Sequence, residues 1–217
     1  MTGDEPGQGL PIIGKEAPDF EATTTQGVLR LSDFRGKKWV VLFSHPADFT
    51  PVCTTEFMAF SAVADELAKL NVQLLGLSID SVHSHLAWVR NIKEKMGVTI
   101  PFPIVADLDM NVARKYGMLH AGQSSTSTIR TVFFIDDKGI MRAMIYYPMS
   151  SGRYIPEIIR LVKSLQLADK YGVSTPANWQ PGDKVVVPAP KTQAEMEKRL
   201  SEGYECKDWY LCFKQLK

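Results

Sequence analysis

One cysteine of this chain, Cys53, lies where local structure could make a thiol unusually reactive. It follows an apolar run and the segment 45–52, and it precedes an amphipathic stretch, so we expect it in the first turn of a helix. With Thr50 as the N-cap, Pro51 takes the first helical position, which proline favours, and Cys53 takes the third. Unpaired amides and the dipole at a helix N-terminus stabilise negative charge, so this position favours a thiolate.

A nucleophilic thiolate in such a position is suited to the reduction of peroxides. Free thiols are only slightly ionised at neutral pH, and a helix N-terminus or a nearby cation increases the ionised fraction. Cleaving a peroxide also requires donors that bind both oxygens and stabilise charge on the departing one, a task for a hydroxyl, backbone amides and a guanidinium. Thr50 and an arginine are the natural candidates. The alternative is that Cys53 is only a small buried hydrophobic residue.

The remaining cysteines, Cys206 and Cys212, stand close together near the end of the chain. Three cysteines among 217 residues argue against a structural disulfide framework of the secreted kind. The spacing of the pair matches neither a Cys-x-x-Cys redox motif nor a zinc motif, and two cysteines do not complete a four-ligand zinc site. Oxidation of Cys53 gives a sulfenic acid, which a second thiol converts to a disulfide. We therefore expect the tail cysteines to resolve oxidised Cys53.

The elements that must position Cys53 alternate between strands and helices. Runs rich in β-branched and aromatic residues predict strands, and apolar residues at helical spacing predict helices between them. The resulting β-α-β-α order implies parallel strands with right-handed crossovers and matches a thioredoxin-like α/β core. The turn 136–139 favours a hairpin between the last two strands. The expected strands are 39–44, 72–79, 131–135 and 140–147, and the expected helices are 54–70, 81–96 and 154–170.

The two ends of the chain differ from this core. Residues 20–31 predict a small hairpin with its turn at Gln26-Gly27, and from Gly172 onward prolines and glycines mark a turn-rich segment. We therefore expect a thioredoxin-like domain at residues 1–171 and a smaller extension at residues 172–217. Within the extension, 192–202 predicts a short helix that begins with a capping box.

The residues around Cys53 resemble a known family. Pro46-x-x-x-Thr50-x-x-Cys53 resembles the peroxiredoxin active-site motif, and the surrounding HPADFTPVCTTE is similar to the subfamily with a long C-terminal domain. The likeness continues through SIDSVHSHLAW at 78–88 and STIRTVFFID at 127–136, so it covers nearly the whole chain. It implies a thiol peroxidase that reduces hydrogen peroxide and organic hydroperoxides in antioxidant defence.

The resemblance also implies roles for individual side chains. Pro46 would shield the sulfur, Thr50 would hydrogen-bond the thiolate and the peroxide, and Arg130 would be the catalytic arginine. Glu56 would orient Arg130, and Arg153 matches a second family arginine near the pocket. Each has a simpler alternative, with Pro46 as an ordinary turn residue, Glu56 as a solvated helix residue and Arg153 as a charge at a helix start.

Histidines offer a weaker signal. His45 precedes the motif and either contacts the pocket or the substrate, or packs as a hydrogen-bonded core residue. His83 and His85 are two residues apart on an expected helix, so they point in different directions, and we expect no carboxylate or cysteine cluster to complete a metal site there. We therefore expect no metal and no cofactor.

The family resemblance extends to partners. In archaeal-type relatives a cysteine of the C-terminal arm pairs with the peroxidatic cysteine of a neighbouring subunit, and the two tail cysteines can pair together. This implies Cys212 as the resolving residue, a thioredoxin-type reductant, and a dimer that assembles into a decamer. The apolar run 141–149 is either an edge for subunit pairing or an ordinary buried strand. The alternative for the tail is a one-cysteine cycle with an external thiol as reductant.

Charge and composition exclude some partners. With 25 basic and 24 acidic residues intermixed, the chain has no charge pattern that favours nucleic acid or an anionic membrane. The first twenty residues do not resemble a signal peptide, and the longest apolar runs are strand-sized. We expect a soluble cytoplasmic protein.

Other functions fit the sequence less well. A thiol-disulfide oxidoreductase needs a second cysteine at position 56, where this chain has Glu56. The phospholipase activity of some relatives needs a serine within a Gly-x-Ser-x-Gly element, and the matching stretch 36–40 is GKKWV. A chaperone role in a large oligomer would be additional to peroxidase activity.

Overall fold

The computed structural model describes residues 10–216. Residues 1–9 lie outside this range, so the segment that we examined for a signal peptide is only partly described. The chain forms two compact units that divide between Ile155 and Pro156. Each unit is described by itself below.

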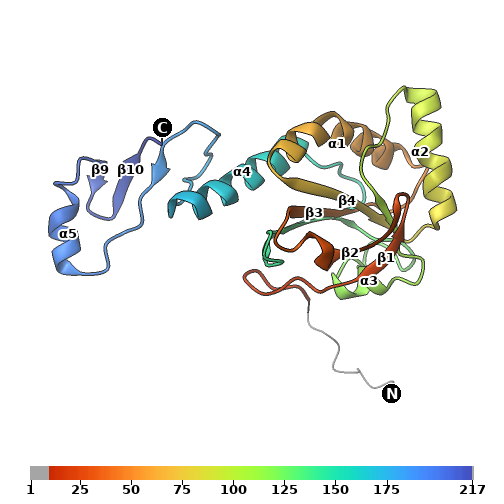
Figure 1. The fold of residues 1–217 in the computed structure, drawn as a ribbon, viewed down its shortest axis with the longest axis horizontal. Coiled ribbons are helices and arrows are strands. Elements are labelled where there is room, and N and C mark those ends of the chain that lie inside the picture. Colours follow the sequence, from red (N-terminus) through yellow and green to blue (C-terminus); the bar gives the residue numbers. More distant parts are fainter. Residues whose placement is uncertain (1–9, 217) are drawn as a thin grey trace, which may run out of the picture. The chain divides into compact units, whose positions relative to one another are not determined.

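A mixed seven-stranded sheet forms the centre of the first unit (Figure 1). Its order is β2-β1-β5-β4-β3-β6-β7, with β3, β4 and β5 parallel and the remaining neighbours antiparallel. All six residues of β3 are buried, as its uninterrupted apolar sequence predicts. The predicted core strands and the β1–β2 hairpin are confirmed. The bounds are β1 Glu21–Thr24, β2 Gly27–Arg30, β3 Trp39–Ser44, β4 Val72–Ser78, β5 Ile104–Ala106, β6 Arg130–Ile135 and β7 Met141–Tyr147.

The helices of this unit begin and end at residues suited to helix termini. The first long helix, α1 (Pro51–Lys69), packs against β4 and buries Phe57, Phe60 and Leu67 on one face. The second, α2 (Val82–Met96), packs against β5. The side chain of Ser81 caps α2 by accepting a hydrogen bond from the Ser84 amide at 3.2 Å, and Gly97 ends the helix at φ 72°. A 3-10 turn, η1 (Leu31–Phe34), and a short helix, α3 (Asn111–Lys115), complete the unit.

The second unit contains the turn-rich tail. It comprises α4 (Ile155–Tyr171), α5 (Gln193–Arg199) and a small antiparallel sheet with the order β8-β10-β9. Its strands are β8 Val185–Val186, β9 Glu205–Asp208 and β10 Leu211–Lys214. The helix predicted at 192–202 is present but ends earlier, at Arg199.

The division between the units lies at the start of α4, whereas the sequence places the domain boundary near residue 171, after this helix. Side chains of α4 explain the difference. Ser164 Oγ is hydrogen-bonded to Thr175 Oγ1 at 2.7 Å, and Arg160 Nη1 donates to the Trp179 carbonyl at 3.4 Å. The change in composition at Gly172 therefore marks the end of a helix that remains attached to the segment following it.

Candidate active site

Cys53 occupies the third position of α1, as predicted. Thr50 is the N-cap, with extended backbone angles, and Pro51 opens the helix. Cys53 is a free thiol and its exposed fraction is 0%. The Thr50 side chain does not cap the helix, and its hydroxyl donates to the Ala47 carbonyl at 2.9 Å. The first-turn amides therefore have no bond from this N-cap side chain, and they stabilise negative charge on the sulfur.

Arg130, the first residue of β6, lies beside this sulfur. Its Nη1 is 3.3 Å from Cys53 Sγ and donates to Glu56 Oε2 at 2.7 Å. Its Nε donates to the Met149 carbonyl at 2.9 Å, so the guanidinium is fixed at two points. The structure thus brings together Cys53 and Arg130, 77 residues apart in the sequence, as the motif implies.

Arg153 holds Glu56 in place. Its backbone N and its Nε both donate to Glu56 Oε1 at 2.9 Å, and its Nη2 donates to Oε2 at 2.5 Å. Its Nη1 donates to the carbonyls of Ser44, at 2.7 Å, and Thr131, at 2.9 Å, while the guanidinium lies 5.1 Å from the centre of the Phe43 ring. Burial lowers the pKa of Arg153 and Glu56 opposes this shift. These contacts exclude the alternatives of a solvated glutamate and an unpaired charge at a helix start.

The ionic network beside Cys53 carries an excess of positive charge. One carboxylate, Glu56, faces two guanidinium groups, those of Arg130 and Arg153, and all three side chains are at most 4% exposed. Buried charge without a counterion is costly, so the excess positive charge calls for an anion. Cys53 Sγ, 3.3 Å from Arg130 Nη1, lies where an anionic group would meet this charge.

The other two motif residues, Pro46 and Thr50, make no hydrogen bond to the Cys53 sulfur. Pro46 is buried and follows β3 at the start of the active-site loop, here residues 46–50. The expected hydrogen bond from Thr50 to the sulfur is absent, because the single hydroxyl proton of Thr50 goes to Ala47. Its lone pairs remain able to accept a hydrogen bond.

A buried cluster that the sequence analysis missed anchors this loop. Asp48 Oδ1 lies 2.9 Å from His45 Nε2, and Asp48 Oδ2 lies 2.8 Å from His85 Nδ1. The sequence analysis expected no carboxylate or cysteine cluster to complete a metal site at His83 and His85, yet one possible ligand atom each from His45, Asp48 and His85 lies within 4.8 Å of the others. His83 is exposed, so the two histidines of α2 do diverge as expected. Both α2 and the loop with Asp48 follow neighbouring parallel strands, whose carboxyl ends share one edge of the sheet, and this signal could have revealed the cluster.

Hydrogen bonds join the residues of this cluster to one another and to their neighbours. His85 Nδ1 lies 2.8 Å from Asp48 Oδ2, and His85 Nε2 lies 3.2 Å from the Val105 carbonyl oxygen. Asp48 also accepts from Ser84 Oγ at 2.8 Å, and its amide donates to Asp80 at 3.0 Å. Burial alone would raise the pKa of Asp48, but the hydrogen bonds from the two histidines hold it well below its usual range.

His45 belongs to this packed cluster. Its exposed fraction is 0%, its ring lies 4.8 Å from that of Phe57 and 5.1 Å from that of Trp88, and Nε2 bonds Asp48. Burial lowers the pKa of His45, although Asp48 opposes the shift. These contacts favour the interpretation of His45 as a hydrogen-bonded core residue.

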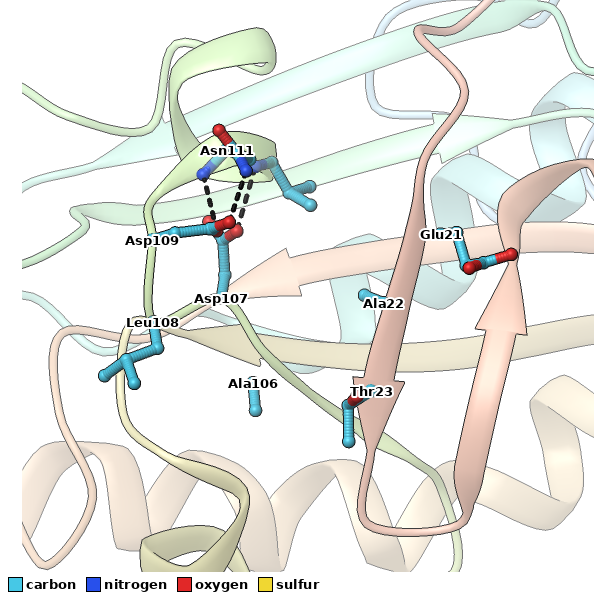
Figure 2. Close-up of a pocket in the computed structure, with 9 residues that line it drawn as sticks. Glu21, Ala22, Thr23, Ala106, Asp107, Leu108, Asp109 and Asn111 are labelled. Carbon is cyan, nitrogen blue, oxygen red and sulfur yellow. Dashed lines mark hydrogen bonds between the residues drawn. The ribbon is translucent and has the colours of Figure 1, made fainter.

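A cavity of about 470 Å³ at the carboxyl end of β5 shares no lining residue with this site (Figure 2). Its acids already have partners. Asp107 accepts hydrogen bonds from the amides of Val112, at 2.9 Å, and Ala113, at 2.7 Å, and Asp109 accepts from the Asn111 amide at 3.2 Å. Figure 2 shows both carboxylates beside the first turn of α3, so they cap that helix.

The tail cysteines form a disulfide in the second unit. Cys206 of β9 and Cys212 of β10 are directly opposite in the antiparallel register. Cys212 is 0% exposed, and Cys206 is partly exposed.

No described helix in either unit is long and apolar enough to cross a membrane.

An α/β sheet that presents a free cysteine at a helix N-terminus, beside a buried arginine, defines a thiol-dependent oxidoreductase. Comparison with known families gives the more specific assignment. Residues 13–144 match the AhpC/TSA family, and residues 164–203 match the C-terminal domain of 1-Cys peroxiredoxin. The chain therefore belongs to the peroxiredoxins, as the active-site motif implies.

Individual relatives agree with this assignment. The chain is 59% identical over 218 residues to a peroxiredoxin of Aquifex aeolicus, covering 95% of this chain and 98% of the relative. Peroxiredoxin 2 of Caldanaerobacter subterraneus is 58% identical over 209 residues, covering 95% and 94%. Among solved structures, a yeast mitochondrial 1-Cys peroxiredoxin is 42% identical with a TM-score of 0.85, covering 95% of this chain and 100% of that one.

Peroxiredoxin 6 of Arenicola marina has a TM-score of 0.85 at 38% identity, covering 95% of this chain and 98% of that one. These matches confirm the thioredoxin-like fold with a C-terminal extension. They also establish the general activity, which is that of a peroxidase and oxidoreductase in antioxidant function.

Proposed function

We propose that the chain reduces hydrogen peroxide and organic hydroperoxides through a sulfenic acid on Cys53, which Cys212 of a neighbouring subunit resolves and a thioredoxin-type reductant recycles. The observation that carries the first step is the contact of 3.3 Å between Arg130 Nη1 and Cys53 Sγ within the buried ionic network. The family match supports the peroxide as substrate.

The chemistry at Cys53 follows from this geometry. The thiolate attacks one peroxide oxygen, the O–O bond breaks, and the leaving oxygen departs with the bonding electrons. Arg130 stabilises the charge that develops on the oxygens, and the Thr50 hydroxyl accepts a hydrogen bond from the peroxide. The leaving oxygen takes a proton to become water or alcohol, and Cys53 keeps the other oxygen as a sulfenic acid.

In the second half of the cycle, the Cys212 thiol attacks the sulfenic sulfur, which releases water and forms a disulfide between Cys53 and Cys212. Cys206 then attacks the Cys212 sulfur, which frees Cys53 and gives the tail disulfide that the structure contains. A dithiol reductant returns both tail cysteines to thiols. Because Cys53 is fully buried, the first turn of α1 has to open before its sulfur meets another chain.

Two observations favour a second candidate, a one-cysteine cycle in which an external thiol reduces Cys53 directly. Residues 164–203 match the C-terminal domain of 1-Cys peroxiredoxin, and the yeast relative is described as a 1-Cys peroxiredoxin resolved through glutathione and thioredoxin systems. In that cycle the tail disulfide would be structural.

We further propose a cytoplasmic homodecamer built from dimers, with residues 1–171 as the peroxidase domain and 172–217 as the arm. The strand β7 lies at one end of the seven-stranded sheet. Residues 14–16 pair with its start at Met141, and the rest of its outer edge is suited to pairing with a second copy. Analytical ultracentrifugation of the reduced protein tests this directly, since a monomer would exclude resolution between subunits.

The decisive experiment adds one equivalent of hydrogen peroxide to the fully reduced protein, blocks free thiols and maps disulfides by mass spectrometry, with Cys53→Ser as the control. A disulfide between Cys53 and Cys212 of different chains, or a Cys206–Cys212 disulfide beside a free Cys53 that does not form in Cys53→Ser, supports the two-cysteine cycle. Sulfenic or sulfinic acid on Cys53, with both tail cysteines still free, supports the one-cysteine cycle. An unmodified Cys53 with both tail cysteines still free contradicts both.

A further inference from the structure

We infer that the reductant attacks the sulfur of Cys206, and that Cys212 is the leaving group. This inference rests on the proposed function, in which a dithiol reductant opens the tail disulfide, and it names the atom at which electrons enter.

The two sulfurs occupy different positions in the small sheet. The strand β10 is central and pairs with both β8 and β9, whereas β9 is an edge strand. Cys206 and Cys212 are cross-strand partners, so the bond between them runs from the edge strand toward the centre of the sheet. A thiolate must approach a disulfide in line with the bond, from the side opposite the leaving sulfur. Attack on Cys206 therefore comes from the free edge of β9.

Attack on Cys212 would have to come from the covered side. The Val187 amide, just after β8, donates to the Cys212 carbonyl at 2.9 Å, so the chain continues along this side of β10. Cys212 Sγ also lies 3.5 Å from the Asp208 carbonyl and 3.9 Å from the Trp209 carbonyl, beneath the turn that joins β9 to β10. These neighbours leave Cys212 with an exposed fraction of 0%, while Cys206 is partly exposed.

The exchange balances as two displacements. The first thiolate of the reductant bonds to Cys206 Sγ, and the electron pair of the tail disulfide leaves with Cys212, which takes up a proton. The freed Cys212 thiol has an acceptor already in place, the Asp208 carbonyl. The second thiol of the reductant then attacks the reductant's own first sulfur, which is bonded to Cys206 in the mixed disulfide. This releases Cys206 as a thiol and leaves the reductant as a disulfide, oxidised by two electrons. Cys212, the proposed resolving residue, is thus the first of the pair to become free.

The test uses the full-length Cys53→Ser protein with its tail disulfide formed, and needs no peroxide. The probe is a thioredoxin whose second active-site cysteine is replaced by serine, so that the mixed disulfide is trapped; the reaction is quenched with acid and analysed by peptide mass spectrometry. We expect at least about a tenfold excess of the adduct on Cys206, with Cys212 as a free thiol.

The matched control treats the same Cys53→Ser protein with glutathione in place of thioredoxin, once in concentrated urea and once without urea. Unfolding exposes both sulfurs, so we expect the preference to fall to about one to one, whereas glutathione on the folded protein should retain it. An adduct mainly on Cys212, equal adducts on the folded protein, or no adduct while dithiothreitol opens the disulfide would each overturn the inference. Failure of the proposed cycle would appear instead in the peroxide mapping, where neither a link between Cys53 and Cys212 nor a tail disulfide that depends on Cys53 would form.

Discussion

The two regions that carry cysteines control sulfur chemistry by different means. Beside Cys53 the charged side chains of Arg130, Glu56 and Arg153 are buried and paired, and those of Arg153 and Glu56 are 0% and 2% exposed. In the tail, the ion pair of Lys184 and Glu205 is 48% and 56% exposed. Solvent weakens exposed pairs, whereas buried ones impose a fixed field. We infer that electrostatics determines the reactivity of Cys53 and that access determines the reactivity of the tail disulfide.

Replacing Arg130 should have the largest effect, and it tests whether electrostatics governs the reaction of Cys53. We expect Arg130→Lys to lower the second-order rate constant for hydrogen peroxide by roughly 100-fold to 1000-fold, because lysine lacks the planar fork that reaches Cys53, Glu56 and Met149 together. Stopped-flow measurement of peroxide consumption provides the rate. A loss of less than threefold would show that electrostatics at this position does not govern the reaction.

Glu56→Gln tests the buried network itself. Removing the carboxylate leaves Arg130 and Arg153 without their counterion, and we expect a loss of about 3–5 kcal/mol in the free energy of unfolding, measured in urea. Glu205→Gln is the matched control, since it breaks an ion pair exposed to solvent and should leave stability essentially unchanged. Equal effects of the two variants would remove the distinction between the regions.

The sequence predicts the elements of the first unit well because long apolar runs determine them. The strand β5 has only three residues and the tail strands have two to four, too few for a period to be recognised, so these were missed. The helix position and the motif identified Cys53, and the family resemblance identified Arg130, Glu56 and Arg153, but neither shows which hydrogen bonds these side chains make with one another. Hydrogen-bond partners depend on the distances between elements, which no local pattern contains.

Two other differences between the sequence prediction and the structure also arise because contacts depend on the distances between elements. Asp48 and His85 are 37 residues apart and meet only because β3 and β4 are parallel neighbours. Thr50 was expected to bond the sulfur, yet the loop places the Ala47 carbonyl within reach of its only proton. In both cases the residue was visible in the sequence and its partner was not.

The buried His45, next to the active-site loop, should make the stability of the first unit depend on pH. Burial lowers the pKa of His45, so near neutral pH the unfolded state binds a proton that the folded state does not. Stability should therefore fall as the pH decreases below about 6.5, by up to roughly 1.4 kcal/mol per pH unit. Urea unfolding between pH 7.5 and pH 5 measures the slope.

We expect His45→Asn to reduce this slope, whatever its effect on stability at pH 7.5. His83→Asn, which changes an exposed histidine of α2, should retain the slope of the unmodified protein. A slope unaffected by His45→Asn would assign the pH dependence to other groups.

The smallest expected effect concerns how the helices begin. In the tail, Thr192 caps α5 by accepting from the Glu195 amide at 3.2 Å, whereas the Thr50 hydroxyl gives no such cap to α1. We expect Thr192→Ala to weaken α5 locally by about 1 kcal/mol, seen as roughly fivefold faster amide exchange within 195–199. Thr50→Val should leave amide exchange of α1 unchanged but slow peroxide reduction, because it removes the acceptor for the peroxide proton. Faster exchange in α1 would instead mean that Thr50 stabilises the helix, and that its first-turn amides are not reserved for the charge on Cys53.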